Sequence, residues 1–278
     1  MKNFTDRVAV ITGAGSGIGR ALAIELADRG AQLALSDINE AAVSETVTLC
    51  QNRGAQAKGY RLDVADRDQV AAHAAEVVEQ FGRVNLVVNN AGVALKANVE
   101  EMSYADLDWL MGINFWGVVH GTKEFLPHLI ASGDGHLVNI SSVFGLIGVP
   151  TQSAYNAAKF GVRGFTEALR QEMLIDRRPV GVSCVHPGGI QTNIARDARA
   201  ADGSTHQSRA DDFAKIAKTS PQEAAKTIIR GVERSRARIL IGADAYVIDA
   251  MPRLLGSAYQ RLGVLGVRLA KRFGVGGL

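Results

Sequence analysis

The most constraining feature of the sequence is a regular alternation of short apolar runs with longer segments of helical period. Runs rich in Val, Ile and Leu, such as RVAVIT at 7–12, predict buried strands. The segments between them, such as GIGRALAIELADRG at 17–30, predict helices. Further strands are expected at 31–37, 55–63, 84–90, 135–141, 180–187 and 237–242, and further helices at 39–54, 66–82, 104–131, 153–176 and 221–235. The helix at 104–131 is expected to break at Gly117.

This alternation predicts an α/β fold. Apolar strands that mostly do not alternate are typical of a parallel sheet buried on both faces. Right-handed crossovers then produce a doubly wound, mainly parallel, seven-stranded Rossmann-type sheet with helices on both faces, in a single domain. Ligands of such sheets bind outside the carboxyl ends of the strands, so those ends are where functional residues are expected.

Composition and charge narrow the class of protein. The chain of 278 residues is 47% hydrophobic and 21% charged, which is typical of a globular protein. The net charge of +3 is too small to indicate a nucleic-acid partner. Cys50 and Cys184 form neither a metal-binding spacing nor a disulfide framework, so no metal site is expected. The absence of a signal peptide pattern and of long apolar runs leads us to expect a cytoplasmic protein.

A glycine-rich stretch, TGAGSGIG at 12–19, follows the first predicted strand and opens the first helix. Gly13, Gly17 and Gly19 permit a tight turn and close approach of a phosphate, which the free N–H groups of the helix N-terminus would bind. Position 18 is Ile, so the spacing departs from G-x-G-x-x-G, and a merely structural turn stays open. The position between strand and helix favours nucleotide binding.

Asp37 ends the second predicted strand, where a carboxylate accepts hydrogen bonds from the adenosine ribose. A helix cap is the alternative role, and both hold if Asn39 does the capping. A carboxylate here would repel a 2′-phosphate, and Ile38 and Ser16 supply no cation to bind one. These residues favour NAD over NADP, and Arg20 is the nearby cation that argues for NADP.

Polar or small residues also stand at the other strand ends. Asp63 could bind the adenine amine and Val64 supply a backbone contact, although a turn aspartate is nearly as good an interpretation. The stretch NNAG at 89–92 offers asparagines that tie strands together and a glycine that leaves room for a ligand. Ser141 and Ser142 end the fifth long strand, and HPGGIQT at 186–192 ends the sixth.

Tyr155 and Lys159 stand four apart in SAYNAAKF at 153–160, on one face of a predicted helix. The alternative interpretation is that the two side chains simply share a solvent-exposed face of the helix, a solvated stripe without function. A phenol of pKa about 10 is a poor base near neutrality, but an ammonium and a positive nicotinamide nearby would favour the phenolate. Lowering the pKa by roughly three units requires about 4 kcal/mol. Ser142 would donate to the oxygen on which negative charge develops in reduction.

The motifs TGAGSGIG, NNAG, NISS, YNAAK and HPGGIQT occur in this order, and the chain resembles a classical short-chain dehydrogenase/reductase from about residue 5 to 195. The resemblance implies Tyr155 as catalytic acid/base, Lys159 as its helper, Ser142 as the hydroxyl that orients the substrate oxygen, and Asn114 as the anchor of a proton-relay water. A polar residue that breaks a helix is the alternative role for Asn114. His186, His120 and His128 are interpreted as structural.

Together, the strand ends and the resemblance predict a cofactor site and a substrate site. The cofactor site comprises Gly13, Ser16, Gly17, Ile18, Gly19, Asp37, Asp63, Val64, Asn90, Ala91, Gly92, Tyr155, Lys159, Pro187, Gly188, Ile190 and Thr192. The substrate site comprises Ser142, Val143, Phe144, Gln152 and Tyr155. Leu146 and Val149 are also expected near the substrate pocket, whose residues are mostly apolar. No arginine in that loop is available to bind a carboxylate or phosphate of the substrate.

The expected function is therefore an NAD-dependent oxidoreductase that interconverts an uncharged, fairly hydrophobic secondary alcohol and its ketone. The alternatives are an NADPH-dependent carbonyl reductase of the same fold and a non-catalytic nucleotide-sensing protein. The latter would be expected to have lost Ser142, Tyr155 or Lys159, and all three are present. The resemblance implies a homodimer or homotetramer.

The C-terminal part departs from the family pattern. We expect residues 1–243 to form the dinucleotide-binding and catalytic domain, with a substrate lid at about 190–220. Residues 244–278 are a longer extension that mixes Leu, Val and Met with Arg and Lys. Packing on the pocket or on a subunit interface is the favoured role, and contact with a membrane surface is a less favoured alternative.

Overall fold

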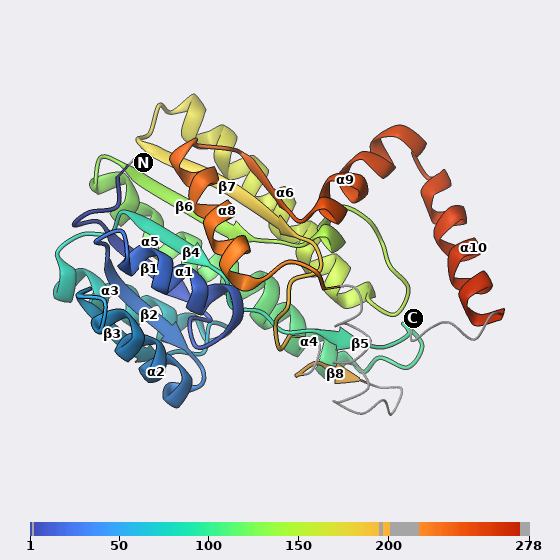
Figure 1. Ribbon diagram of the computed structural model, residues 1–278, viewed down its shortest axis with the longest axis horizontal. Coiled ribbons are helices and arrows are strands. Elements are labelled where there is room, and N and C mark those ends of the chain that lie inside the picture. The colour runs from blue at the N-terminus through green and yellow to red at the C-terminus, as the bar shows by residue number, and fades with distance from the viewer. Residues whose placement is uncertain (2, 195–196, 201–216, 273–278) are drawn as a thin grey trace.

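The computed structural model describes residues 1, 3–194, 197–200 and 217–272, and in it a seven-stranded parallel sheet forms the centre of the molecule (Figure 1). The strand order is β3-β2-β1-β4-β6-β7-β9. Every pairing in this sheet is parallel. The doubly wound, seven-stranded fold expected from the sequence is confirmed.

The elements follow the predicted alternation closely. The strands are β1 (Val8–Thr12), β2 (Gln32–Asp37), β3 (Ala57–Arg61), β4 (Leu86–Asn89), β5 (Leu95–Lys96), β6 (Gly135–Ile140), β7 (Val180–Pro187), β8 (Arg199–Ala200) and β9 (Arg238–Ile241). The α-helices are α1 (Gly17–Ala27), α2 (Glu40–Gln51), α3 (Arg67–Phe81), α4 (Tyr104–Met111), α5 (Gly117–Ala131), α6 (Ser153–Ile175), α8 (Pro221–Glu233), α9 (Ala243–Leu255) and α10 (Ala258–Arg272).

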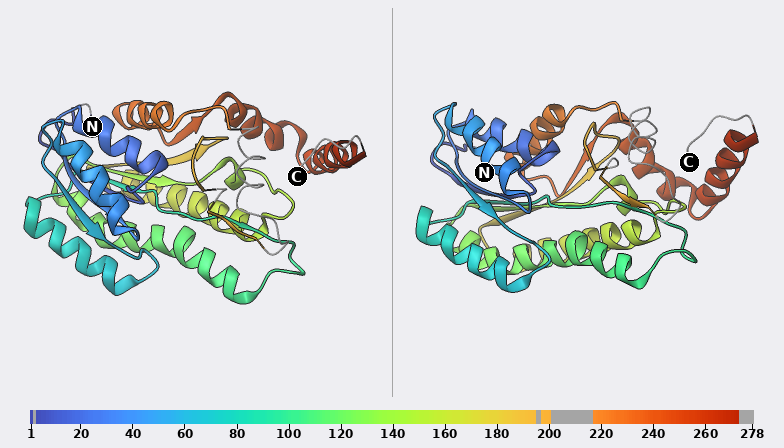
Figure 2. Two further views of the ribbon diagram at one scale, coloured as in Figure 1. Left: turned by 60° about the horizontal axis from the view of Figure 1, so that its bottom comes forward. Right: turned by 90° about the horizontal axis from the view of Figure 1, so that it is seen from below.

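Two helical layers cover the sheet, with α1, α2 and α8 on one face and α3, α5 and α6 on the other (Figure 2). Successive strand residues point to opposite faces. In β1, Ala9 and Ile11 pack in the core beneath α1 and α8, while Val10 packs in the core beneath α5. Because both faces are buried, the strands need apolar residues at nearly every position, which explains their unalternating sequences.

The segment from 104 to 131 differs from the prediction of a break at Gly117. The chain remains helical through Gly117, and the irregularity lies just before it, in a π-helical turn over Gly112–Trp116. This turn contains the buried side chain of Asn114. Such turns recur at functional sites, because they change the direction of the groups that follow.

A second, two-stranded sheet is absent from the sequence prediction. It pairs β5 in parallel with β8, each only two residues long, and joins the chain after β4 to the chain after β7. Elements this short carry too little apolar pattern to be recognised in a sequence. Much of the predicted lid at about 190–220, namely residues 195–196 and 201–216, lies outside the described residues.

The C-terminal extension forms two helices of different character. Helix α9 belongs to the body: Ala245 is fully buried, and Asp249 pairs with Arg238 at 2.8 Å. Helix α10 stands away from the body in every view (Figures 1 and 2). No described helix is both long enough and apolar enough to cross a lipid bilayer.

Candidate active site

The predicted site residues gather at the carboxyl edge of the sheet. Strand β1 lies between β2 and β4, so the winding of the chain reverses at this point and the connections diverge to opposite faces. A crevice at such a reversal is the usual ligand site of a doubly wound sheet. The loops after β1, β4, β6 and β7 all begin at this edge.

The glycine loop after β1 is held against the end of β4. The amide of Asn90 donates to Thr12 O at 2.9 Å and to Gly13 O at 3.2 Å. Gly13 has a positive φ of 64°, and a Cβ there would lie 2.8 Å from the Cα of Ala91. Only glycine fits both requirements. The glycine loop and the chain after β4 are therefore held in close contact.

Helix α1 begins without a side-chain cap, because Ser16 makes no capping hydrogen bond. Helix α2, in contrast, is capped by Asn39, which accepts from Ala42 N at 3.1 Å. An uncapped N-terminus leaves N–H groups and a positive dipole end available to an anion. Thr192 reaches this end of α1, since a Cβ on Gly17 would lie 3.1 Å from its Cγ2.

Asp37 ends β2 and is not the cap of α2. Its carboxylate accepts from Gly15 N at 2.9 Å and from Asn39 N at 2.9 Å, while Asn39 caps the helix. Asn39 therefore does the capping, as the sequence analysis allowed, and the ribose role of Asp37 stays a prediction. Arg20, the cation that argued for NADP, donates to Gly15 O at 2.6 Å and to Glu45 at 2.7 Å.

Buried asparagines tie adjacent strand ends together, as the sequence suggested. Asn89, on β4, donates to Asn139 Oδ1 on β6 at 2.8 Å, and Asn139 donates to Thr166 on α6 at 3.0 Å. Asn139 is fully buried. Because a buried amide is costly to leave unpaired, this chain of hydrogen bonds holds the strand ends and α6 in one arrangement.

Asp63 and Val64 make contacts within the protein at the end of β3. The carboxylate of Asp63 accepts from Ala65 N at 2.9 Å, which is the turn role considered from the sequence. The carbonyl oxygen of Val64 lies 3.2 Å from Nδ1 of His120. A role of Asp63 and Val64 in binding adenine stays a prediction.

Ser142, Tyr155 and Lys159 are brought together by β6 and α6. Ser142 lies two residues after the end of β6, and its Oγ accepts from Phe144 N at 3.1 Å, which leaves the hydroxyl proton free to donate. The Ser142 hydroxyl lies close enough to Tyr155 to lower the pKa of the phenol. The Lys159 Nζ lies 5.6 Å from the centre of the Tyr155 ring and is 3% exposed as a residue. The pair is thus no solvated stripe.

In the protein by itself the pKa of Tyr155 is raised to about 12. Burial of the phenol is the main cause, and the nearby hydroxyl of Ser142 opposes it. The lowered value expected from the sequence includes the charge of a bound nicotinamide and stays a prediction. Burial also lowers the pKa of Lys159 to about 8. The Lys159 ammonium donates to Ile140 O at 3.0 Å, away from the phenol oxygen, so in the protein alone desolvation outweighs the charge of the lysine.

Asn114 lies beside this group and is fully buried. Its amide forms a closed pair with Val93, accepting from Val93 N and donating to Val93 O, both at 2.8 Å. A Cβ on Gly92 would lie 3.2 Å from Asn114 Oδ1 and 3.6 Å from Lys159 Nζ. Asn114, Gly92 and Lys159 therefore surround one space, and the side chain of Asn114 fixes the strand end that borders it.

The loop after β7 is anchored to the C-terminal part of the chain. Gly188 N donates to Ile241 O at 2.9 Å, and Gly189 N donates to Asp244 at 2.8 Å. Ile190 is buried and pairs with Thr219. Thr192 lies against Gly17 at the start of α1, so the loop after β7 meets the glycine loop. A part of Pro187, Gly188 and Ile190 in binding the cofactor stays a prediction.

The predicted substrate residues border the phenol. The ring of Phe144 meets the ring of Tyr155 edge to face, with centres 6.1 Å apart, and Val143 is buried behind it. Gln152 immediately precedes α6, and its backbone pairs with Ala97. Of these residues, Phe144 contacts the ring of Tyr155 directly, and a part of Gln152 in binding the substrate stays a prediction.

Asn156 is a site residue that the sequence analysis missed. Its amide donates to Phe144 O at 2.7 Å and to Ile147 O at 2.8 Å, and its oxygen accepts from Val149 N at 3.0 Å. One side chain thereby shapes the apolar loop that borders Tyr155. Its place inside YNAAK is the signal that could have revealed it.

The structural interpretation of His186 and His120 agrees with their contacts. His186 Nδ1 lies 2.9 Å from Ser142 O, and burial lowers the pKa of its imidazole to about 4. His120 stacks on Trp116 as well as approaching Val64. Within the described residues, no group of three or more His, Cys, Asp or Glu side chains is placed to hold a metal ion.

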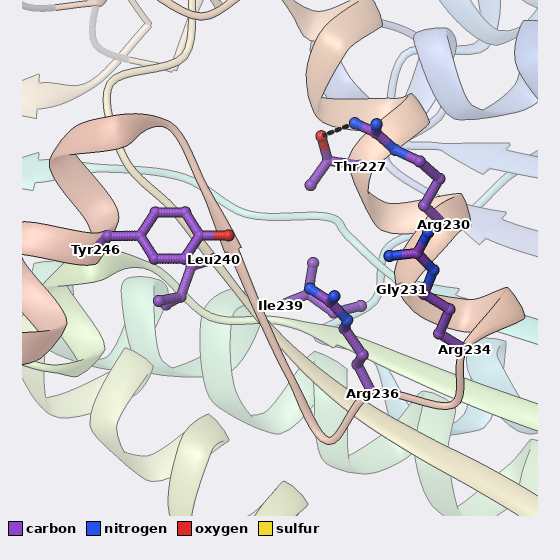
Figure 3. Close-up of a pocket in the computed structure, with 8 residues that line it drawn as sticks. All are labelled: Thr227, Arg230, Gly231, Arg234, Arg236, Ile239, Leu240 and Tyr246. Atoms are coloured by element: carbon purple, nitrogen blue, oxygen red, sulfur yellow. Dashed lines mark hydrogen bonds between the residues drawn. The ribbon is translucent and has the colours of Figure 1, made fainter.

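A shallow pocket of about 200 Å³ opens elsewhere, between α8, β9 and α9 (Figure 3). Arg230, Arg234 and Arg236 line it together with Tyr246. In Figure 3, Arg230 donates to Thr227, at 3.2 Å. The pocket contains none of the predicted catalytic or cofactor-binding residues, so it is separate from the candidate active site.

Comparison with known proteins agrees with this geometry. The family model described as short chain dehydrogenase matches residues 7–203. The chain is 58% identical over 268 residues to the protein named "Putative oxidoreductase SadH" of Mycobacterium tuberculosis, covering 96% of this chain and 97% of that protein.

Solved structures show the same fold. A short chain dehydrogenase/reductase from Burkholderia phymatum in complex with NAD superposes with a TM-score of 0.84 at 32% identity, covering 94% of this chain and 97% of that one. The structure named Levodione Reductase has a TM-score of 0.78 at 30% identity, covering 88% of this chain and 99% of that one. The chain belongs to the short-chain dehydrogenase family and is an oxidoreductase that works with a nicotinamide cofactor.

The residues present fit such a cofactor. The glycine loop and the uncapped start of α1 would hold the pyrophosphate, and Asp37 would accept from a ribose. The space around Gly92 and Lys159 lies on the way to Tyr155. A dinucleotide that extends from one end of this edge to the other would bring its reactive ring to the phenol.

Proposed function

We propose that the protein is an NAD-dependent oxidoreductase that interconverts a secondary alcohol and a ketone on an uncharged, fairly hydrophobic substrate. The observation that carries this proposal is the buried Lys159 ammonium 5.6 Å from the centre of the Tyr155 ring, with the Ser142 hydroxyl near the same phenol. These groups lie at the sheet edge that the glycine loop also reaches.

In this mechanism Tyr155 holds and moves the proton. In the reducing direction the substrate oxygen accepts from Ser142 Oγ and Tyr155 Oη, and the phenol proton passes to it as negative charge develops. The cofactor supplies or accepts the hydride. Lys159, with a pKa of about 8, stays charged at neutral pH and stabilises the phenolate that remains. Asn114 holds the chain at Val93, next to Lys159. We also propose that Asn114 anchors a water of the proton relay.

The preference for NAD rests on charges around Asp37. Its carboxylate would accept from the adenosine ribose of a bound cofactor, and it would repel a 2′-phosphate. The guanidinium of Arg20 is engaged by Gly15 O and Glu45, and Ile38 is 54% exposed without offering a charge. An NADPH-dependent carbonyl reductase is the competing proposal, and kcat/KM measured with both cofactors separates the two.

An apolar substrate is supported by the loop that borders Tyr155. Residues 142–152 contain no charged side chain, and Val143 and Leu146 are buried within that loop. A carboxylate or phosphate on the substrate would find no cation in this segment. A screen of secondary alcohols and ketones, followed by nicotinamide absorbance, should rank uncharged hydrophobic compounds first.

Assembly and location complete the proposal. Exposed apolar side chains on the outer helical layer, including Trp116, Phe160 and Ile175, support a homodimer or homotetramer. Cys50 and Cys184 are free buried thiols, which is compatible with a reducing cytoplasm.

The variant Tyr155→Phe tests the catalytic assignment. Loss of the phenol proton should lower kcat by at least about 100-fold, the usual contribution of a general acid/base. Binding of NADH, followed by its fluorescence, should stay within a factor of about two, because the ring itself is kept. Full turnover by Tyr155→Phe would remove the assignment, whereas cofactor binding without turnover of any compound by the wild type would favour a nucleotide-sensing protein.

A further inference from the structure

The C-terminal arm, residues 250–272, comprises the end of α9 and helix α10, and it has a charge and an exposure that the catalytic site does not explain. It contains five basic residues, Arg253, Arg261, Arg268, Lys271 and Arg272, and no Asp or Glu. This local charge exceeds the net charge of +3 of the whole chain. Helix α10, which carries most of it, stands away from the body (Figures 1 and 2).

The arm also exposes large apolar side chains. Leu254 is 82% exposed, and Leu262 and Leu265 of α10 are 56% and 54% exposed. Leu262 and Leu265 are three residues apart and share one face of the helix. Arg261 and Arg268, seven residues apart, share the neighbouring face. An apolar face flanked by arginines is the pattern of a helix that lies in the plane of a lipid surface.

We propose that the arm binds an anionic lipid surface, with its leucines in the headgroup boundary and its arginines on the lipid phosphates. The positive charge of the arm favours an anionic lipid surface over a second copy of the arm as its binding partner. A two-fold contact would bring identical patches together and oppose their positive charges. An anionic surface instead offers complementary charge, as the cytoplasmic leaflet of a membrane does.

One contact fixes how the bound protein would be oriented. The Tyr259 hydroxyl accepts from Gly148 N at 3.1 Å, which joins α10 to the loop between Ser142 and α6. This loop is the one that Asn156 shapes beside the candidate active site. Binding of the arm would therefore place the entrance of the site next to the lipid. The lipid-binding proposal itself does not depend on the proposed reaction.

Vesicle co-sedimentation of the full chain tests the inference. The wild type should bind vesicles of an equal mixture of phosphatidylcholine and phosphatidylglycerol, bind pure phosphatidylcholine far more weakly, and dissociate as salt is raised. Arg261→Gln with Arg268→Gln should weaken partitioning about 30-fold, as the usual contribution of two cations near an anionic surface implies. Leu262→Gln with Leu265→Gln should also abolish binding, because the apolar face is lost.

The matched control removes the same charge elsewhere. Arg230 and Arg234 are exposed on α8, outside the arm, and have no carboxylate within ion-pairing distance in the described part of the chain (Figure 3). Arg230→Gln with Arg234→Gln should leave vesicle binding within a factor of about two. Equal weakening by both pairs would show a general charge effect and overturn the proposal.

Assembly is measured in parallel by light scattering after size exclusion. If the leucine variant changes the subunit number while the wild type ignores anionic vesicles, the arm is a subunit contact and the lipid proposal is wrong. Binding of wild type to both vesicle types at equal strength would also overturn it. Dehydrogenase activity on water-soluble alcohols should be the same in all these variants, which keeps this test separate from the proposed function.

Discussion

Lys159→Met should make the protein more stable near neutral pH while removing its activity. Lys159 is 3% exposed, and burial lowers its pKa from 10.5 to about 8. This difference means that keeping the ammonium charged costs the folded state about 3 kcal/mol at pH 7. Methionine is similar in length and apolar, and its main penalty is the lost hydrogen bond to Ile140 O, about 1 kcal/mol. The net gain in the free energy of unfolding should be about 2 kcal/mol.

The pH dependence of this gain has a definite sign. Below pH 8 both folded and unfolded wild type carry the proton on Lys159, and the full cost is present. Between pH 8 and 10.5 the folded state releases the proton while the unfolded state still holds it, so wild-type stability rises with pH. The advantage of Lys159→Met should therefore disappear by about pH 10.

Urea denaturation of both proteins at pH 7 and near pH 10 measures these quantities. Lys123→Met is the matched control, because Lys123 is exposed on α5, and its effect should not change over the same range. A Lys159→Met protein less stable than wild type at pH 7, or a difference independent of pH, would refute the reasoning. The ammonium would then be better solvated than its burial indicates.

Three further substitutions test parts of the cofactor and site framework. Asp37→Ser should lower the ratio of kcat/KM for NAD to that for NADP by about tenfold or more, since hydrogen bonds to a charged group contribute about 1.5–3 kcal/mol. An unchanged ratio would remove Asp37 from cofactor selection. Gly19→Ala puts a methyl group onto the glycine-loop backbone and should cost about 1–3 kcal/mol and weaken NADH binding, whereas Gly164→Ala, with open space around it, should stabilise α6 by up to about 1 kcal/mol. Equal stability of the two alanine variants would contradict this. Asn114→Leu leaves the Val93 N–H and C=O unpaired and should lower the free energy of unfolding by about 2 kcal/mol or more, as urea denaturation can measure.

The strands and the order of the site motifs could be predicted from the sequence because their signals are local. A strand buried on both faces must be apolar at successive positions, and this requirement is visible in residues 7–12 without any knowledge of neighbours. The glycine loop can also be recognised from the sequence. Gly13 and Gly17 have positive φ, a conformation that glycine adopts at little cost and that other residues rarely adopt.

Other features required contacts between distant segments. The two-residue strands β5 and β8 form only because the chain after β4 and the chain after β7 come together. Asn156 was missed because its partners belong to a loop whose path is not visible in the sequence. The leucines of α10 show an amphipathic pattern in the sequence, but only the structure shows that this face is uncovered.

The sequence alone determined which groups can react: a phenol, an ammonium and a hydroxyl at the edge of a parallel sheet. The tertiary structure alone decided their proton affinities, raising the pKa of Tyr155 and lowering that of Lys159. The physical reason is that desolvation depends on every atom packed around a group, whereas chemical identity and spacing belong to the chain itself.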